Sequence, residues 1–501
     1  MRQPPPLHVL AVSAVLMTPL CGQTPPSPPA PAGPDAARPT PRSEVPAWGY
    51  TDFGPPGAVA SRTHVDDLDF TEVAFANGVR LNVKRTTFDR NSIRVAARLG
   101  TGQLTEPAAT QPGLSTFASL TFSTGGLGKL GIDDLAKVLV GKPAGIHFTS
   151  TMDAFIFEGQ TNPQNLLFEL QLLTASIADP GYRPEAQRVA RGRIEAAYQS
   201  FAHSERGPLA LQVPKLLAGG DPRFGLPART EMMARTLDEL RAWLGPQLAS
   251  GPLEVSVVGD VDVDTVIDAA ARTLGALPRR EPRAPLDDLR KVSFPRQPFT
   301  KDYAVETNIP KGLVAVYWPA ADGMDSGRAR RLNLLGVMLA DRLRVKVNDR
   351  LPNAVSPTVG STASDIFPGY GYLAAIAIVD PPRAKEIVSA IVAVAADLGA
   401  NGVKKEDFDA AMARTLKSVL ESELTNTYWM TVLGRAQERP EVLDWARNRL
   451  ADFKAVTKAD IDALAKDYLG EDKASRVIIH PYPAPVSSPL LVSPTPPPDG
   501  M

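Results

Sequence analysis

Residues 236–260 read TLDELRAWLGPQLASGPLEVSVVGD, and residues 457–481 read TKADIDALAKDYLGEDKASRVIIHP. Each stretch opens with a threonine that has an acidic residue three positions later, which is typical of a capping box at the start of a helix. Each then passes through a turn into a strand rich in β-branched residues. The predicted strands are Glu254–Val258 and Arg476–Ile479. The chain therefore contains the same helix–turn–strand unit twice.

A longer correspondence precedes each unit. Residues 162–201 and 380–420 both read as an amphipathic helix, a break that contains glycine, and a second helix. Strand candidates lie ahead of both: Ile93–Leu99, Ile146–Glu158, Gly312–Trp318 and Tyr370–Val379. The sequence therefore predicts an α+β protein made of two duplicated αβ-sandwich domains, with antiparallel-rich sheets covered by helices.

Proline marks the ends of the folded part. Of 48 prolines, 15 fall in residues 1–60 and 8 in residues 481–501, a density typical of extended, disordered segments. The predicted organisation is a signal segment (1–21), a disordered Pro-rich linker (22–60), an N-terminal domain (61–280), a linker (281–300), a C-terminal domain (301–480) and a Pro-rich tail (481–501).

The charge balance and the N-terminus bear on partners and location. The net charge of −1 over 501 residues gives no electrostatic footprint for a nucleic acid.

Arg2 followed by the apolar run from Leu7 to Cys21 is typical of an export signal. Cys21 is the only cysteine, and its place ahead of a Pro/Ala/Gly linker resembles a bacterial lipoprotein signal. We expect a periplasmic protein, or one held at the envelope only by a lipid on Cys21.

Four short motifs carry a resemblance to a known family. FANGVRL (75–81), ADPGYRPEA (178–186), GDPRFGLP (220–227) and VVGDVD (257–262) occur in this order. Together with the duplication and an opening strand expected at residues 75–86, they resemble the insulinase/pitrilysin family of zinc metallopeptidases, in particular its half-length bacterial periplasmic branch. In active members, a helix after the first strand carries H-x-x-E-H, in which two histidines bind zinc and the glutamate acts as general base.

The corresponding helix here has lost this motif. Laying H-x-x-E-H over GLSTFASLTFSTGG (113–126) places Thr116 and Leu120 at the histidines and Ser119 at the glutamate. The resemblance implies a third ligand, a glutamate within Glu185–Glu195, but one carboxylate cannot form a three-ligand site. We expect no metal and no cofactor in this chain, and zinc only in a partner chain.

The resemblance also implies a substrate-orienting Arg/Tyr pair in the C-terminal domain. In VNDRLPNAVSPT (347–358), Asn348 takes the place of the arginine and Val355 that of the tyrosine. Arg344 or Arg350 remains an alternative source of the positive charge.

One element of the family could persist without catalysis. GIHFTSTMDAFIF (145–157) resembles the strand that pairs with an extended peptide, here through Ile146, His147, Phe148 and Thr149. β-Augmentation needs only an open edge with free N–H and C=O groups. The alternative is an ordinary sheet strand.

The expected function is that of a non-catalytic subunit or scaffold, which pairs through the inner faces of its domains with an active insulinase-family homologue, or with a second copy, to close a peptide-binding chamber. Two alternatives stay open: a zinc metalloendopeptidase completed by a partner chain, and a stand-alone periplasmic peptide-binding protein.

Overall fold

The structure, a computed structural model, describes residues 45–350 and 357–482. The N-terminal part forms a sheet with the strand order β1-β2-β3-β7-β4-β6-β5. Only β3 and β7 run parallel in it; the other neighbouring strands are antiparallel. The strands are β1 Val59–Val65, β2 Phe70–Phe75, β3 Arg80–Arg85, β4 Ile93–Leu99, β5 Ile146–Ser150, β6 Phe155–Thr161 and β7 Leu253–Gly259.

The C-terminal sheet repeats this topology. Its order is β10-β11-β9-β12-β8, in which the last strand, β12, lies parallel to β8 and antiparallel to β9. In the same way β7 lies between β3 and β4. The strands are β8 Thr300–Glu306, β9 Gly312–Pro319, β10 Thr358–Ala363, β11 Gly371–Val379 and β12 Ser475–Tyr482. The predicted α+β duplication is therefore confirmed.

The helices also correspond in pairs. α4 follows the hairpin β5–β6 and α12 follows the hairpin β10–β11, α5 and α13 come next, and α9 and α16 lead into the last strand. The helices are α2 Leu114–Thr121, α3 Ile132–Leu139, α4 Leu166–Ala178, α5 Pro184–Ala202, α6 Gly207–Leu211, α7 Val213–Leu217, α8 Arg229–Met233, α9 Leu237–Ser250, α10 Val263–Arg272, α11 Ser326–Arg350, α12 Ala384–Asn401, α13 Lys405–Glu423, α14 Asn426–Leu433, α15 Glu441–Ala455 and α16 Lys458–Tyr468.

Both predicted capping boxes are present. Thr236 Oγ1 accepts from Glu239 N at 3.2 Å, and Glu239 Oε2 accepts from Thr236 N at 2.8 Å. Thr457 and Asp460 exchange the same two bonds at the start of α16. These bonds satisfy N–H groups that the first helical turn leaves without partners, so each helix begins at a defined residue ahead of its strand.

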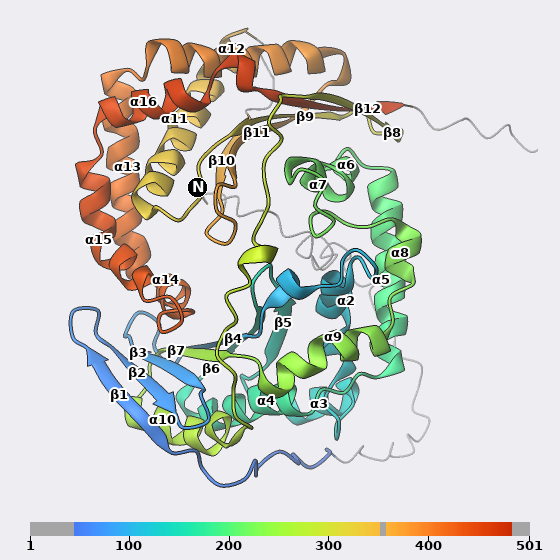
Figure 1. The fold of residues 1–501 in the computed structure, drawn as a ribbon, viewed down its shortest axis with the longest axis vertical. Helices are drawn as coiled ribbons and strands as arrows, with labels where there is room; N and C mark the ends of the chain where they lie inside the picture. The colour runs from blue at the N-terminus through green and yellow to red at the C-terminus, as the bar shows by residue number, and fades with distance from the viewer. Residues whose placement is uncertain (1–44, 351–356, 483–501) are drawn as a thin grey trace, which may run out of the picture.

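The two sheets lie between outer helical layers (Figure 1), with α12 on the outer side of the C-terminal sheet and α4 and α10 on that of the N-terminal sheet. Each domain has its own core of buried aliphatic and aromatic side chains. Each domain also covers part of the other. Val213 and Leu217 of α7 pack with Leu313 and Ile479 of the C-terminal sheet, and Leu433 of α14 packs with Phe70 of the N-terminal sheet.

Three local predictions differ from the structure. The stretch 75–86, expected as one strand, is a turn followed by β3, because Asn77 Oδ1 accepts from Val79 N and Gly78 takes a φ of 87°. Ile146–Glu158, also expected as one strand, is the hairpin β5–β6, closed where Thr151 N donates to Ala154 O at 2.9 Å.

The third difference concerns the predicted disordered linker, 22–60, whose last part is ordered. Tyr50 is 4% exposed. Its hydroxyl donates to Asp179 Oδ2 at 2.7 Å and accepts from Lys129 N at 2.8 Å, and Trp48 Nε1 donates to Gln171 Oε1 at 2.9 Å. Aromatic side chains with a polar end stabilise a segment when both parts find partners, which the proline count alone cannot indicate.

Candidate functional site

The helix α2 contains the three positions onto which H-x-x-E-H was laid. It begins after Gly113, whose φ of 83° and close contact with Pro227 and Met232 leave no room for a side chain. Its residues Leu114, Phe117 and Ala118 are fully buried in the N-terminal core.

The three substituted positions therefore have three different surroundings. Leu120 is 2% exposed and belongs to the N-terminal core. Ser119 is 7% exposed and faces β5. Thr116 is half-buried. A leucine in the core offers no ligand atom, and hydroxyl groups are not among the usual zinc ligands, so this helix face does not assemble a metal site.

Three serines with a spacing of four residues, Ser115, Ser119 and Ser123, form a stripe on the side of α2 that faces β5; we call it the serine stripe. Ser115 Oγ lies 2.8 Å from Ser150 Oγ. Ser119 Oγ accepts from Ser150 N at 3.0 Å, and Ser123 Oγ accepts from Phe148 N at 3.3 Å. Side chains four residues apart share one helix face, so this spacing is the sequence signal that could have revealed the contact.

The strand predicted to receive a peptide is β5, at the edge of the sheet. Ile146 and Thr149 are half-buried, His147 is exposed and Phe148 is buried against Phe122, with the two ring centres 4.2 Å apart. Of the four predicted residues, Phe148 already donates its N–H to the serine stripe.

The region expected to supply a third metal ligand lies on α5. Glu195 Oε2 pairs with Arg229 at 2.6 Å, and its Oε1 accepts from Gln199 at 3.1 Å. The hydrogen bonds from Gln199 and Arg229 hold the pKa of Glu195 below its usual value. Glu185 is exposed in the first turn. Within residues 45–350 and 357–482, no group of three His, Cys, Asp or Glu side chains could hold a metal ion.

Two buried glutamates flank the helix and strand of the site. Glu106 Oε1 accepts from Leu114 N at 2.7 Å, at the start of α2, and Glu169 Oε2 accepts from Gly145 N at 2.9 Å, just before β5. Burial raises the pKa of each carboxyl to about 7, although the hydrogen bonds from backbone N–H groups oppose the rise. Both groups therefore change charge near neutral pH.

The predicted orienting pair falls at the edge of what the structure describes. Asn348 belongs to the last turn of α11, and Val355 lies outside the described residues. Arg344 is exposed and lies 3.8 Å from Asp341 on the same helix. Cys21 and the whole predicted signal segment also lie outside the described residues.

A network of polar side chains joins the two domains at the inner face of the N-terminal sheet. Glu254 on β7 is 3% exposed. Its Oε1 accepts from Asn82 Nδ2 at 2.7 Å and from Gln437 N at 2.9 Å, and its Oε2 accepts from Glu438 N at 2.9 Å. Burial nevertheless raises its pKa, because removal from water outweighs these bonds. The sequence did not predict this contact, because isolated polar residues within a strand form no recognisable pattern.

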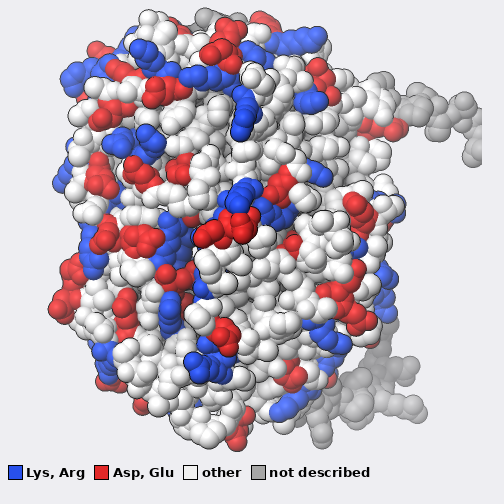
Figure 2. All heavy atoms as spheres, viewed as in Figure 1, with Lys and Arg blue, Asp and Glu red and all other residues white. Residues whose placement is uncertain are grey.

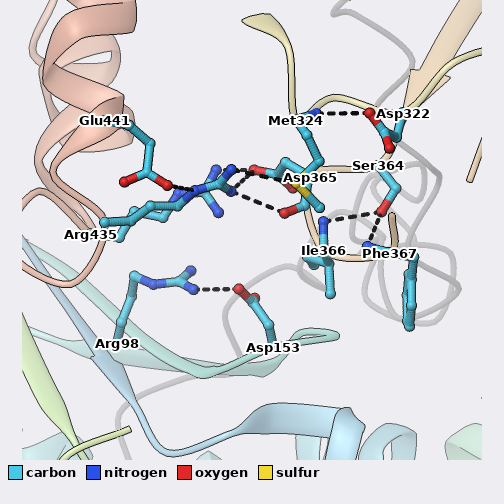
Figure 3. Close-up of polar contacts among 11 residues, drawn as sticks. Arg98, Asp153, Asp322, Met324, Ser364, Asp365, Ile366, Phe367, Arg435 and Glu441 are labelled. Carbon is cyan, nitrogen blue, oxygen red and sulfur yellow. Dashed lines mark hydrogen bonds and ion pairs between the residues drawn. The ribbon is translucent and has the colours of Figure 1, made fainter. Parts of the chain in front are cut away.

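The network continues as alternating charges (Figure 3). Arg98 of β4 pairs with Asp153 of the β5–β6 turn at 2.9 Å, and Arg435 pairs with Asp365. Arg283 of the predicted interdomain linker pairs with Glu438 at 2.6 Å. Burial alone would raise the pKa of Asp153, but the guanidinium groups of Arg98, Arg435 and Arg283 hold it below its usual value.

These contacts bear on the surface expected to meet a partner. The inner faces of both domains were expected to pair with a second chain, and α7 covers part of the C-terminal sheet and α14 part of the N-terminal sheet. On the face shown in Figure 2, acidic and basic side chains are interspersed. In the described parts of the chain, no single helix is long and apolar enough to cross a membrane.

Comparisons with known proteins agree with this fold. Residues 235–415 match the family described as peptidase M16 inactive domain, whereas no curated protein sequence is significantly similar. The periplasmic protease PqqL from Escherichia coli aligns with 89% of this chain and 48% of its own, at 15% identity and a TM-score of 0.69.

Two further solved structures show the same likeness. A mutant of the ferredoxin protease FusC, in complex with Arabidopsis ferredoxin, aligns over 91% of this chain and 49% of its own, at 15% identity and a TM-score of 0.68. The peptidase M16 inactive domain from Pseudomonas fluorescens aligns over 83% and 98%, at 16% identity and a TM-score of 0.69. The chain thus spans about half the length of PqqL and FusC. The expected resemblance to insulinase-type peptidases is confirmed: the chain has the M16 fold, and its residues 235–415 match the model of the peptidase M16 inactive-domain family.

Proposed function

We propose that this chain is a non-catalytic M16 subunit that assembles with a catalytically intact homologue, or with a second copy, and contributes one half of a peptide-binding chamber. The observation that carries the proposal is the fate of the metal motif. Leu120 is part of the core and Ser119 is bonded to β5, so two of the three motif positions serve packing inside the domain.

The length relationship supports the need for a second half. The chain aligns with about half of PqqL and of FusC, and FusC was solved with a protein, ferredoxin, bound. In this proposal, a second chain supplies the half of such a protein to which this chain does not align. A specific interface of this kind buries on the order of 1,200–2,000 Å² or more, and it has to use surface that α7 and α14 leave uncovered.

We further propose that the protein works outside the cytoplasm, exported through residues 1–21 and held at the envelope by a lipid on Cys21. The periplasmic origin of PqqL agrees with this location. Fractionation of wild type and Cys21→Ser separates the two steps. Membrane association that persists in the variant would refute the lipid anchor, and cytosolic wild type would refute export.

The assembly is tested by reconstitution. The tagged chain is co-purified, a companion that carries H-x-x-E-H is produced separately, and the rate of cleavage of an internally quenched peptide is measured for each chain alone and for the mixture. We expect the mixture to sediment as one complex, and the companion to be less active when alone. As a control, replacing the motif glutamate of the companion with glutamine should abolish all cleavage, because this chain supplies no general base.

Two results would overturn the proposal. Cleavage by this chain alone that a chelator abolishes would mean that it is an active peptidase. A strictly monomeric chain that leaves the rate of the companion unchanged would leave only a stand-alone peptide-binding role.

A further inference from the structure

Among residues 45–350 and 357–482, the strand β5 is the last strand of the N-terminal sheet, and one of its edges has no neighbouring strand there. The β5–β6 hairpin is closed where Thr151 N donates to Ala154 O. In an antiparallel pair, alternate residues exchange hydrogen bonds with the partner strand and those between point their N–H and C=O groups outward. Counting back from Thr151, the outward groups of β5 belong to Ile146, Phe148 and Ser150.

The serine stripe binds this outward edge. Ser150 N donates to Ser119 Oγ at 3.0 Å and Phe148 N donates to Ser123 Oγ at 3.3 Å. The hydroxyl of Ser115 lies 2.8 Å from that of Ser150. Two successive outward N–H groups are therefore already paired, each with a different turn of the same helical segment.

Aromatic packing holds the helix against the strand. Phe122, which follows α2, stacks on Phe148 with an angle of 26° between the rings, and it meets Phe157 of β6 edge-on at 5.5 Å. Moving α2 aside would expose these rings as well as break the serine bonds. The contact is thus supported by apolar burial and by hydrogen bonds together.

We infer that α2 is an internal cap on the outer edge of β5, so that in this chain the strand does not accept a peptide by β-augmentation while the helix is in place. An added strand needs the outward N–H groups as donors, and the serine stripe occupies those of Phe148 and Ser150. This inference rests on the proposed function in one respect: a peptide held in the assembly would be bound by the partner chain.

The cap also accounts for the residue at position 119. The hydroxyl that accepts from Ser150 stands where H-x-x-E-H has its glutamate. The metal motif and the cap therefore compete for the same side chain: a serine at position 119 replaces the general base of the motif and supplies one of the two acceptors that close the strand edge.

Hydrogen–deuterium exchange of the isolated chain, read by mass spectrometry over residues 145–151, tests the cap. We expect Ser119→Ala and Ser123→Ala each to speed exchange in this segment by about tenfold, as the loss of one hydrogen bond implies. Ser176→Ala is the matched control. Ser176 is also a buried helical serine, but its hydroxyl bonds only to Leu172 O of its own helix, so the segment should exchange as in wild type.

A second measurement does not depend on the variants. Reduced, carboxymethylated casein, an unfolded polypeptide, is added in excess to the wild-type chain. We expect unchanged exchange over residues 145–151. Slower exchange on addition of casein would overturn the cap, and so would unchanged exchange in both serine variants. Neither result depends on a partner chain, so failure of the cap and failure of the proposed assembly are separate outcomes.

Discussion

Replacing Glu254 with alanine tests how firmly the two domains are joined. The carboxylate accepts hydrogen bonds from three donors, two of which are backbone N–H groups of the α14–α15 connection, Gln437 and Glu438. Each buried donor left without an acceptor costs about 1–3 kcal/mol, and water that enters the space left by the side chain offsets part of this. We expect Glu254→Ala to lower the free energy of unfolding by about 2–4 kcal/mol.

Differential scanning calorimetry is the suitable assay, because a protein with two domains need not unfold in one step. For domains of about 200 residues, 1 kcal/mol corresponds to about 2–4 °C in Tm, so the expected decrease is on the order of 5–10 °C. Small-angle X-ray scattering below the transition should also report a larger radius of gyration, since two of the lost bonds hold the α14–α15 connection on the N-terminal sheet.

Glu421→Ala is the matched control. Glu421 is a largely exposed carboxylate on α13, 3.8 Å from Lys417, and exposed ion pairs of this kind contribute little. Its Tm should stay within about 1 °C of wild type. If Glu254→Ala and Glu421→Ala melt at the same temperature and scatter alike, the buried carboxylate does not join the domains and the reasoning is refuted.

Four further predictions concern buried groups and the metal content. Burial raises the pKa of Glu169 to about 7, from an ordinary value near 4.3. The contribution of this carboxyl to stability is therefore full below pH of about 4 and is lost as the pH rises through 7. Between pH 5 and 8, the Tm of Glu169→Gln should fall less steeply than that of wild type, and parallel curves of Tm against pH would contradict the assignment. Leu120→His places an imidazole in the core and should lower the free energy of unfolding, measured by urea denaturation, by about 2–4 kcal/mol. Stability equal to that of wild type would mean that position 120 is open to solvent. Elemental analysis should find less than one zinc per wild-type chain. Tyr50→Phe removes a hydroxyl with two partners and should lower the free energy of unfolding by about 1–2 kcal/mol. Unchanged stability would mean that the segment around Tyr50 is not fixed on the domain in solution.

The duplicated fold could be predicted from the sequence because the signals for it are local. A capping box and a β-branched strand depend on residues within one stretch, so α9–β7 and α16–β12 were predicted close to their observed bounds. The β5–β6 turn was missed because Thr151–Ala154 contains neither glycine nor proline, and such residues give the strongest signals for turns.

Only part of the candidate site could be predicted from the sequence. The loss of the metal motif is visible in the letters at 116, 119 and 120, but what those residues do instead depends on β5, which lies about 30 residues away in the chain. Likewise, Glu254 acquires its partners from residues of α14–α15 far along the sequence. Contacts of this kind follow from topology, which brings the elements together, and not from any pattern within one element.

The serine stripe and the core together hold α2 in place without the side chains of H-x-x-E-H. An α-helix at the edge of a sheet must satisfy two neighbours: a core that favours apolar side chains and a strand edge with N–H groups that need acceptors. Leu120 satisfies the first and Ser119 the second. Restoring H-x-x-E-H would therefore put an imidazole into the core and remove the acceptor of Ser150 N. Each of these two changes would lower the free energy of unfolding. The same two contacts that stabilise α2 thus occupy two of the three positions onto which the metal motif was laid.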